Sequence, residues 1–186
     1  MKDSPRLWVT VRAGIIAPMT TLILLISSAT ALADPVGRVS AFCSYDVYDT
    51  ASPGFLITPT EGTAHGVGTI TCVGVVDGRQ LSGGPGRFEW WYSYRSSDVP
   101  LGGNTCALAG GSGTWETDLP TVEGAALAMT GSWRAMGNFV GLVHGQLGGL
   151  PARMIYESLA EPEHLEGNCV TQPVSQGRVI GEGTLG

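Results

Sequence analysis

The chain has 186 residues with a formal net charge of −6 at pH 7, and only 14% of its residues are charged. Beyond residue 33 it contains arginine but no lysine. Binding to phosphate groups requires basic side chains, so this composition argues against nucleic acids and anionic membrane surfaces as partners.

Residues 1–33 have the pattern of a secretory signal peptide. Basic residues come first, a mostly apolar segment covers residues 14–26, and Ala31-Leu32-Ala33 is a small-x-small cleavage site. The apolar stretch is long enough to span a bilayer if it stays uncut, but no stop-transfer charges follow it. The first cysteine, Cys43, lies too far from this site for a lipid anchor. We therefore predict cleavage after Ala33 and a single secreted, extracellular domain over residues 34–186.

The four cysteines all lie in the part predicted to be exported. An oxidising compartment and an even number of cysteines predict two disulfides, for which three pairings are possible. We favour Cys43–Cys72 and Cys106–Cys169, each closing a loop that stabilises the fold by about 3–4 kcal/mol. No C-x-x-C pair and no Cys/His metal spacing occurs. The sequence therefore predicts no metal and no other cofactor.

The first half of the predicted domain consists of short β-type runs separated by turn residues. We expect strands over residues 38–48, 55–57, 66–76, 80–81 and 87–95, with turns at 52–54 and 77–78. The clearest strand is 87–95, because its aromatic residues Phe88, Trp90, Tyr92 and Tyr94 alternate with mainly polar neighbours. These aromatics form either the core or the wall of a ligand pocket. Trp91 is the exception on the other face, and either packs under a loop or is an exposed contact residue.

The second half continues in the same way. We expect strands over residues 106–116, 126–134, 139–147, 169–174 and 178–185. In the second of these, Met129 and Trp133 share a face with Gly131, and Arg134 belongs to the opposite face. Residues 151–161 fit either a short helix or a strand, and their surroundings favour a strand.

The motif Gly-x-Gly-Thr occurs three times, beginning at Gly66, Gly111 and Gly181. Repeated glycine in a strand indicates a bulge, a bend or the close approach of another backbone. We interpret the three motifs as equivalent bends in a strongly coiled sheet. Together with nine or ten short strands, they predict an all-β fold in which an antiparallel meander closes into a β-barrel, with a β-sandwich as the alternative.

The motifs that begin at Gly66 and Gly111, together with the segment Glu166-Gly167-Asn168-Cys169-Val170-Thr171-Gln172-Pro173-Val174, resemble recurring motifs of uncharacterised secreted proteins of actinobacteria. The resemblance covers most of residues 34–186 and supports a strand near Met154. Its motifs consist of glycine, threonine and cysteine, so it implies a shared framework and carries over no catalytic residue. The expected barrel is also similar in architecture to allene oxide cyclase-like and lipocalin-like barrels, which implies nothing about function.

Catalytic motifs are absent from the sequence. The three histidines are isolated, the Gly-Ser run at 110–114 misses G-x-S-x-G, and no P-loop occurs. Asp46 with Asp49, and Glu157 with Glu161, are close enough in sequence to pair for acid–base chemistry. Carboxylates this close along a chain are usually solvated, so we expect no catalytic role for them.

Three functional hypotheses follow. The first is a non-enzymatic domain that binds a small apolar or aromatic ligand, or a glycan, through Trp90, Tyr92, Tyr94, Trp133 and Arg134. The second is a structural or protein-interaction role at the cell surface, with a filled interior and Trp91 as the main exposed aromatic. The third is a small-molecule cyclase or isomerase, which requires an inward-pointing ionisable residue such as Glu89, His144 or Glu157, and which fails if all three face solvent. The small number of candidate catalytic residues favours the first hypothesis.

Overall fold

A computed structural model describes residues 40–99, 103–137, 140–159 and 167–186. The predicted signal peptide and the start of the predicted strand at 38–48 lie outside the described residues. The elements are β1 (Ser40–Phe55), β2 (Gly62–Val76), β3 (Arg79–Gln80), β4 (Pro85–Tyr94), the short 3-10 helix η1 (Ser96–Asp98), β5 (Ala109–Pro120), β6 (Ala126–Gly137), β7 (Val140–Leu147), β8 (Leu150–Leu159) and β9 (Val174–Leu185). None of the described residues forms a helix with the length and apolar character needed to cross a membrane.

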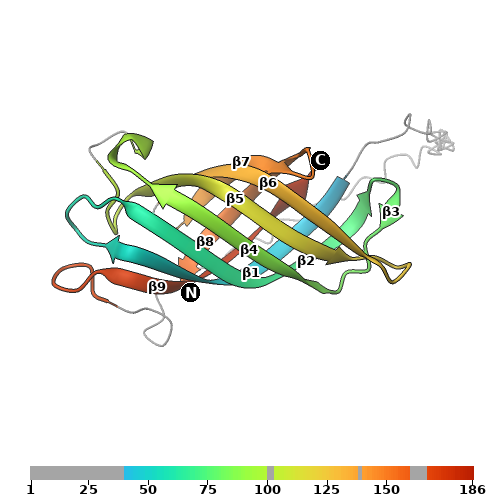
Figure 1. Cartoon of the computed structure of the whole chain (residues 1–186), viewed down its shortest axis with the longest axis horizontal. Coiled ribbons are helices and arrows are strands. Elements are labelled where there is room, and N and C mark those ends of the chain that lie inside the picture. The colour runs from blue at the N-terminus through green and yellow to red at the C-terminus, as the bar shows by residue number, and fades with distance from the viewer. Residues whose placement is uncertain (1–39, 100–102, 138–139, 160–166) are drawn as a thin grey trace, which may run out of the picture. The chain divides into compact units, whose positions relative to one another are not determined.

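The strands form one closed antiparallel β-barrel (Figure 1). Each strand from β4 to β9 pairs with the next along the chain, β2 pairs with β4, and β1 closes the sheet by pairing with both β2 and β9. Eight strands make the barrel, and β3 is a short extra strand beside the end of β2. The expected all-β barrel is therefore confirmed, and the sandwich alternative is wrong.

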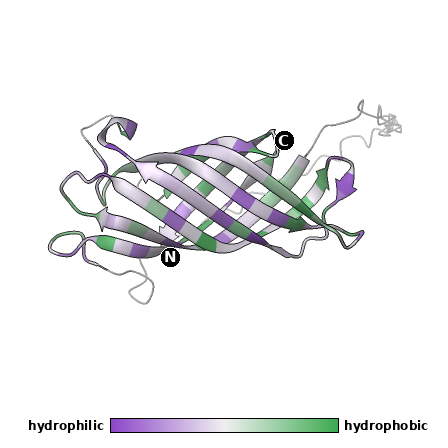
Figure 2. Ribbon diagram, viewed as in Figure 1, coloured by the Kyte–Doolittle hydropathy of each residue, from purple (hydrophilic) through white to green (hydrophobic). Residues whose placement is uncertain are grey.

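The period-2 alternation of side chains decides which residues enter the barrel. Residues of different hydropathy follow one another along the strands (Figure 2), and the side chains that form the core are those on the inward face, while some apolar residues such as Val73 and Leu142 are exposed on the outer face. At the end of the barrel where β1 starts, the interior is filled by side chains that are at most 2% exposed. They include Ile70, Phe88, Leu119, Leu147, Met154 and Leu185.

Both predicted disulfides are present. Cys43–Cys72 joins directly opposed residues of β1 and β2, with the two Cα atoms 4.1 Å apart. Cys106–Cys169 joins the segment before β5 to the segment before β9, with a Cα–Cα distance of 6.1 Å. The first bridge therefore lies within a strand pair, and the second connects two segments at the opposite end of the barrel.

Several predicted boundaries are wrong. Residues 55–57 do not form a separate strand, because β1 continues through Ser52-Pro53-Gly54 to Phe55 with an irregular register against β9. Of the strand predicted at 169–174 only Val174 belongs to a strand, as the first residue of β9. Residues 169–172 turn instead, since Asn168 Oδ1 accepts hydrogen bonds from the backbone N–H groups of residues 170–172. The strand predicted from Cys106 begins at Ala109. The strand interpretation of 151–161 is confirmed by β8, which ends at Leu159.

The three Gly-x-Gly-Thr motifs lie inside strands, and what they share is close packing. A Cβ atom added to the first glycine of each motif, Gly66, Gly111 or Gly181, would meet an aromatic side chain: Trp90, Tyr92 or Tyr45, respectively. A Cβ on the second glycine, Gly68, Gly113 or Gly183, would meet backbone of the neighbouring strand. The glycines thus let aromatic rings and neighbouring backbones come closer than any other residue would allow.

Candidate ligand-binding cavity

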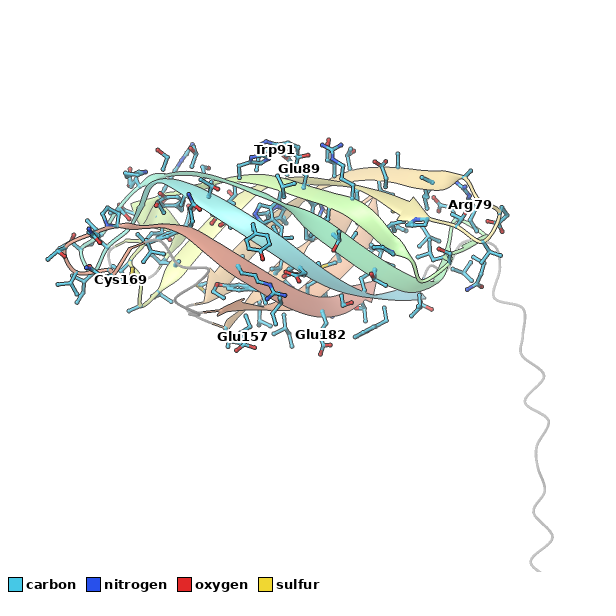
Figure 3. All side chains as sticks on the ribbon, turned by 90° about the horizontal axis from the view of Figure 1, so that it is seen from below. Arg79, Glu89, Trp91, Glu157, Cys169 and Glu182 are labelled. Atoms are coloured by element: carbon cyan, nitrogen blue, oxygen red, sulfur yellow. A yellow bond between two sulfur atoms is a disulfide. The ribbon has the colours of Figure 1, made fainter. Side chains whose placement is uncertain are left out.

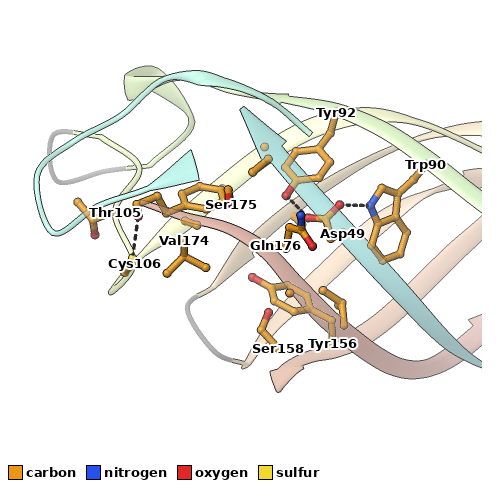
Figure 4. A pocket seen from close by; sticks show the side chains of 18 of the residues that line it. Asp49, Trp90, Tyr92, Thr105, Cys106, Tyr156, Ser158, Val174, Ser175 and Gln176 are labelled. Carbon is orange, nitrogen blue, oxygen red and sulfur yellow. Dashed lines mark hydrogen bonds between the residues drawn. The ribbon is translucent and has the colours of Figure 1, made fainter. Parts of the chain in front are cut away.

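The barrel is hollow in the half where β1 ends. It contains a cavity of about 340 Å³ that is partly open to solvent. Its end at the Cys106–Cys169 bridge, which we call the mouth, is lined by residues 105–106, 109–111, 167–169 and 174–177. Figure 4 shows side chains from several strands converging on it. The aromatic residues in the described part of its wall are Tyr45, Phe55, Trp90, Tyr92, Trp115, Trp133 and Tyr156.

The aromatic wall is held in place by contacts among its own members. Trp133 lies at the centre, with ring centroids 5.2 Å from Tyr92, 6.2 Å from Trp90 and 6.2 Å from Trp115. The indole N–H groups also have partners: Trp133 donates to the carbonyl of Thr114 and Trp115 to that of Gln146. The wall is therefore preformed, and a ligand would meet rings that are already ordered.

Among the described residues that line the cavity, Asp49 is the one with a carboxyl group (Figure 4). Its Oδ1 accepts a hydrogen bond of 2.9 Å from Trp90 Nε1, and its Oδ2 accepts one of 2.7 Å from the Tyr92 hydroxyl. Burial raises the pKa of Asp49, and the two hydrogen bonds oppose part of that rise. Burial and the neighbouring Asp49 in turn raise the pKa of Tyr92, and burial raises the pKa of Tyr156 to about 12.

Asp46 and Asp49 do not pair. Residues three apart on a strand lie on opposite faces, so Asp46 points outward while Asp49 points inward. The Asp46 carboxylate instead accepts hydrogen bonds of 2.8 and 2.7 Å from the guanidinium group of Arg178 on β9. The two acids therefore differ sharply in environment, which makes Asp46 a natural control for experiments on Asp49.

The structure brings three of the five predicted ligand-binding residues to the cavity, namely Trp90, Tyr92 and Trp133. Tyr94 belongs to a separate small cluster with Ala51 and Ala64, where its hydroxyl accepts a hydrogen bond from the Gly54 N–H. Arg134 is exposed on the outer face, so it does not reach the cavity.

Sequence reasoning did not select Asp49 as a binding residue, nor the wall residues Tyr45, Trp115 and Tyr156. A signal for Asp49 was present, because it is in phase with the inward series Cys43, Tyr45 and Val47 of β1. Because Asp49 is polar, it was not recognised as a member of this inward-facing series.

Glu89, His144 and Glu157 all belong to the outer face of the barrel. His144 and Glu157 are exposed, and Figure 3 shows Glu157 projecting outward. Glu89 is covered by its neighbours on the outer surface, where His65 Nε2 lies 2.6 Å from its Oε1 and Arg87 also pairs with it. The His65 hydrogen bond and then Arg87 lower the pKa of Glu89. None of these three residues points into the cavity, and the acid that does so within the described wall is Asp49.

Trp91 is an exposed residue of the outer face (Figure 3) rather than one packed under a loop. It is 40% exposed and stacks on the His65 ring, with centroids 5.2 Å apart. Tyr48 and Phe42 are more exposed, at 55% and 48%. The expectation that Trp91 is the main exposed aromatic is therefore wrong.

Among the described residues, no three His, Cys, Asp or Glu side chains come together in a group that could hold a metal ion. Comparisons of the chain with protein-family models, with curated proteins and with solved structures found no match in any of the three. Inference about function therefore depends on the geometry of the cavity.

The carboxyl group of Asp49 predicts a specific dependence of stability on pH. Because its pKa in the folded state is raised above 3.8, its contribution to stability is complete below that pH and is lost as the pH rises through the folded-state pKa. The titratable groups acting on it are Tyr92, which donates a hydrogen bond, and His65, whose charge lowers the pKa of Asp49.

The variant Asp49→Asn has no titratable group at this position, so its stability should not fall in this way as the pH rises. We expect its free energy of unfolding, measured by urea denaturation, to exceed that of the native protein at neutral pH. The difference should shrink as the pH falls toward about 4. Asp46→Asn, on the outer face, should not show this pattern. An Asp49→Asn variant that is less stable than the native protein at neutral pH would contradict the prediction.

Proposed function

We propose that the barrel is a secreted, non-enzymatic binding domain that holds a small apolar or aromatic molecule in its interior cavity. The observation that carries the proposal is the ordered aromatic wall around a cavity of about 340 Å³ that is partly open to solvent. Ligand sites in proteins are mostly concave, apolar and preformed, with a few polar groups that fix orientation, and their volumes are about 300–1,000 Å³.

Two further features support this proposal. The structural or protein-interaction hypothesis called for a filled interior, whereas half of this barrel is hollow. The two disulfides support export, since such bridges persist mainly in oxidising compartments. Signal cleavage after Ala33 and kinship with secreted actinobacterial proteins remain predictions.

The test is a titration with N-phenyl-1-naphthylamine, a neutral aromatic probe whose emission rises in apolar surroundings. We expect a saturable rise with the native protein. Gly177 lines the cavity and is the cross-strand neighbour of Asp49 on β9. A Cβ atom built at Gly177 meets no other atom within 4 Å. The variant Gly177→Phe should therefore fill the cavity and weaken probe binding by about tenfold or more.

Thr184→Phe is the matched control. It adds the same side chain to the same strand, but at an exposed position of the outer face. We expect it to bind the probe as the native protein does. Equal binding by all three proteins, or no binding by the native protein, would contradict an interior site.

A further inference from the structure

We infer that the cavity selects molecules that carry a positively charged amino group on an apolar body, with Asp49 as the counter-ion. This inference rests on the proposed binding function and adds the chemical class of the ligand. It depends on three observations: a carboxylate with no basic residue beside it in the described wall of the cavity, its fixed orientation, and the rings around it.

The first observation is the charge of the wall. Asp49 is acidic, and none of the described residues that line the cavity is a lysine, arginine or histidine. Buried charges in proteins are normally paired, because removal from water is costly without a partner of opposite charge. Asp46, the neighbouring acid on the outer face, has its arginine. An ammonium group in the cavity would supply the partner that Asp49 lacks within the described wall.

The second observation is that the Asp49 carboxylate is oriented but not saturated. Trp90 donates to one of its oxygens and Tyr92 to the other. A carboxylate has about four acceptor positions, so each oxygen can still accept from a ligand. Since the side chain points inward and stays partly accessible, its free surface faces the cavity. Two neutral donors thus hold the group in place without cancelling its charge.

The third observation is the nature of the surrounding rings. Trp90 and Tyr92 contact Asp49 directly, and the Trp133 ring packs against both of them. A cation over the face of a tryptophan or tyrosine ring is attracted by its electrons, most strongly where water is excluded. An anionic head group beside Asp49 would instead be repelled by the carboxylate. The wall therefore favours an ammonium over a hydroxyl and disfavours a carboxylate.

The experiment compares three probes that share one alkyl chain: octylammonium, 1-octanol and octanoate. Each is titrated at neutral pH against the full secreted domain by isothermal calorimetry, with competition against N-phenyl-1-naphthylamine as a second readout. We expect octylammonium to bind about tenfold more tightly than octanol, and octanoate to bind most weakly. In Asp49→Asn we expect the ratio of the octylammonium and octanol affinities to fall to about one.

Asp46→Asn is the control for the overall charge of the barrel, because it removes one acid from the same strand on the outer face. It should keep the preference for octylammonium. Equal affinities of the three probes for the native protein, a preference for octanoate, or an equal loss of preference in both variants would overturn the inference while leaving an apolar binding site in place. Failure of every probe, the naphthylamine included, would instead overturn the proposed function.

Discussion

Replacing Cys106 and Cys169 together by serine is expected to lower the free energy of unfolding by about 4 kcal/mol. The bridge spans 63 residues, and its loss returns to the unfolded chain the conformational freedom that the closed loop removes. It also holds together the mouth of the cavity, where the Cys106 N–H donates to the carbonyl of Leu56 and the Ile57 N–H donates to that of Cys169. We therefore expect weaker ligand binding as well as lower stability.

Urea denaturation monitored by tryptophan emission measures this effect. Thr105→Ser is a suitable control, because it changes the residue beside Cys106 but keeps both the hydroxyl group and the bridge. Its free energy of unfolding should stay within about 0.5 kcal/mol of the native value. A double serine variant as stable as the native protein would show that the bridge does not restrain the unfolded chain.

The second large effect is expected from Gly66→Val. A Cβ atom at Gly66 would meet the indole ring of Trp90 and would lie 2.7 Å from a methyl carbon of Val47. Valine would therefore displace the Trp90 ring and break its hydrogen bond to Asp49. We expect a loss of about 3 kcal/mol in the free energy of unfolding, the upper range for overpacking a core, together with a loss of probe binding.

Gly177→Val provides the matched control, because it makes the same substitution at another interior glycine. Gly177 lies opposite Asp49 on β9 and has open space where the side chain would be. We expect no loss of stability there, and a gain of up to about 1 kcal/mol, since glycine weakens a strand interior. Similar losses in both variants would mean that the Gly66 position is not specially close to Trp90.

The sequence was sufficient to predict the class of fold because the information needed was local. Alternation in 87–95 placed Phe88, Trp90 and Tyr92 on one face, and the structure shows that face inside the barrel. The cysteine pairing was also predicted correctly. The barrel was preferred over the sandwich because glycines allow strong coiling, and the closing pair of β1 with β9 agrees with that choice.

The candidate site was predicted only in part, because it depends on relations between distant strands. Asp49 becomes a binding candidate only when β4 supplies Trp90 and Tyr92 from 41 and 43 residues away. Arg134 was named as a binding residue together with Trp133, yet adjacent residues on a strand face opposite sides, so only Trp133 reaches the cavity. The turn at 168–172 was missed because Asn168 competes for backbone N–H groups that a strand would use.

One half of the barrel is filled and the other is hollow. This division separates the demands of stability from those of ligand binding, which usually conflict. The fully buried aliphatic side chains Leu119, Leu147 and Leu185 do not line the cavity, and they are different residues from those of its aromatic wall. Substitutions in that wall can therefore change which molecule is bound without disrupting the hydrophobic core that stabilises the fold. Such a scaffold lends itself to redesign, with one end as a fixed base and the other as a replaceable receptor.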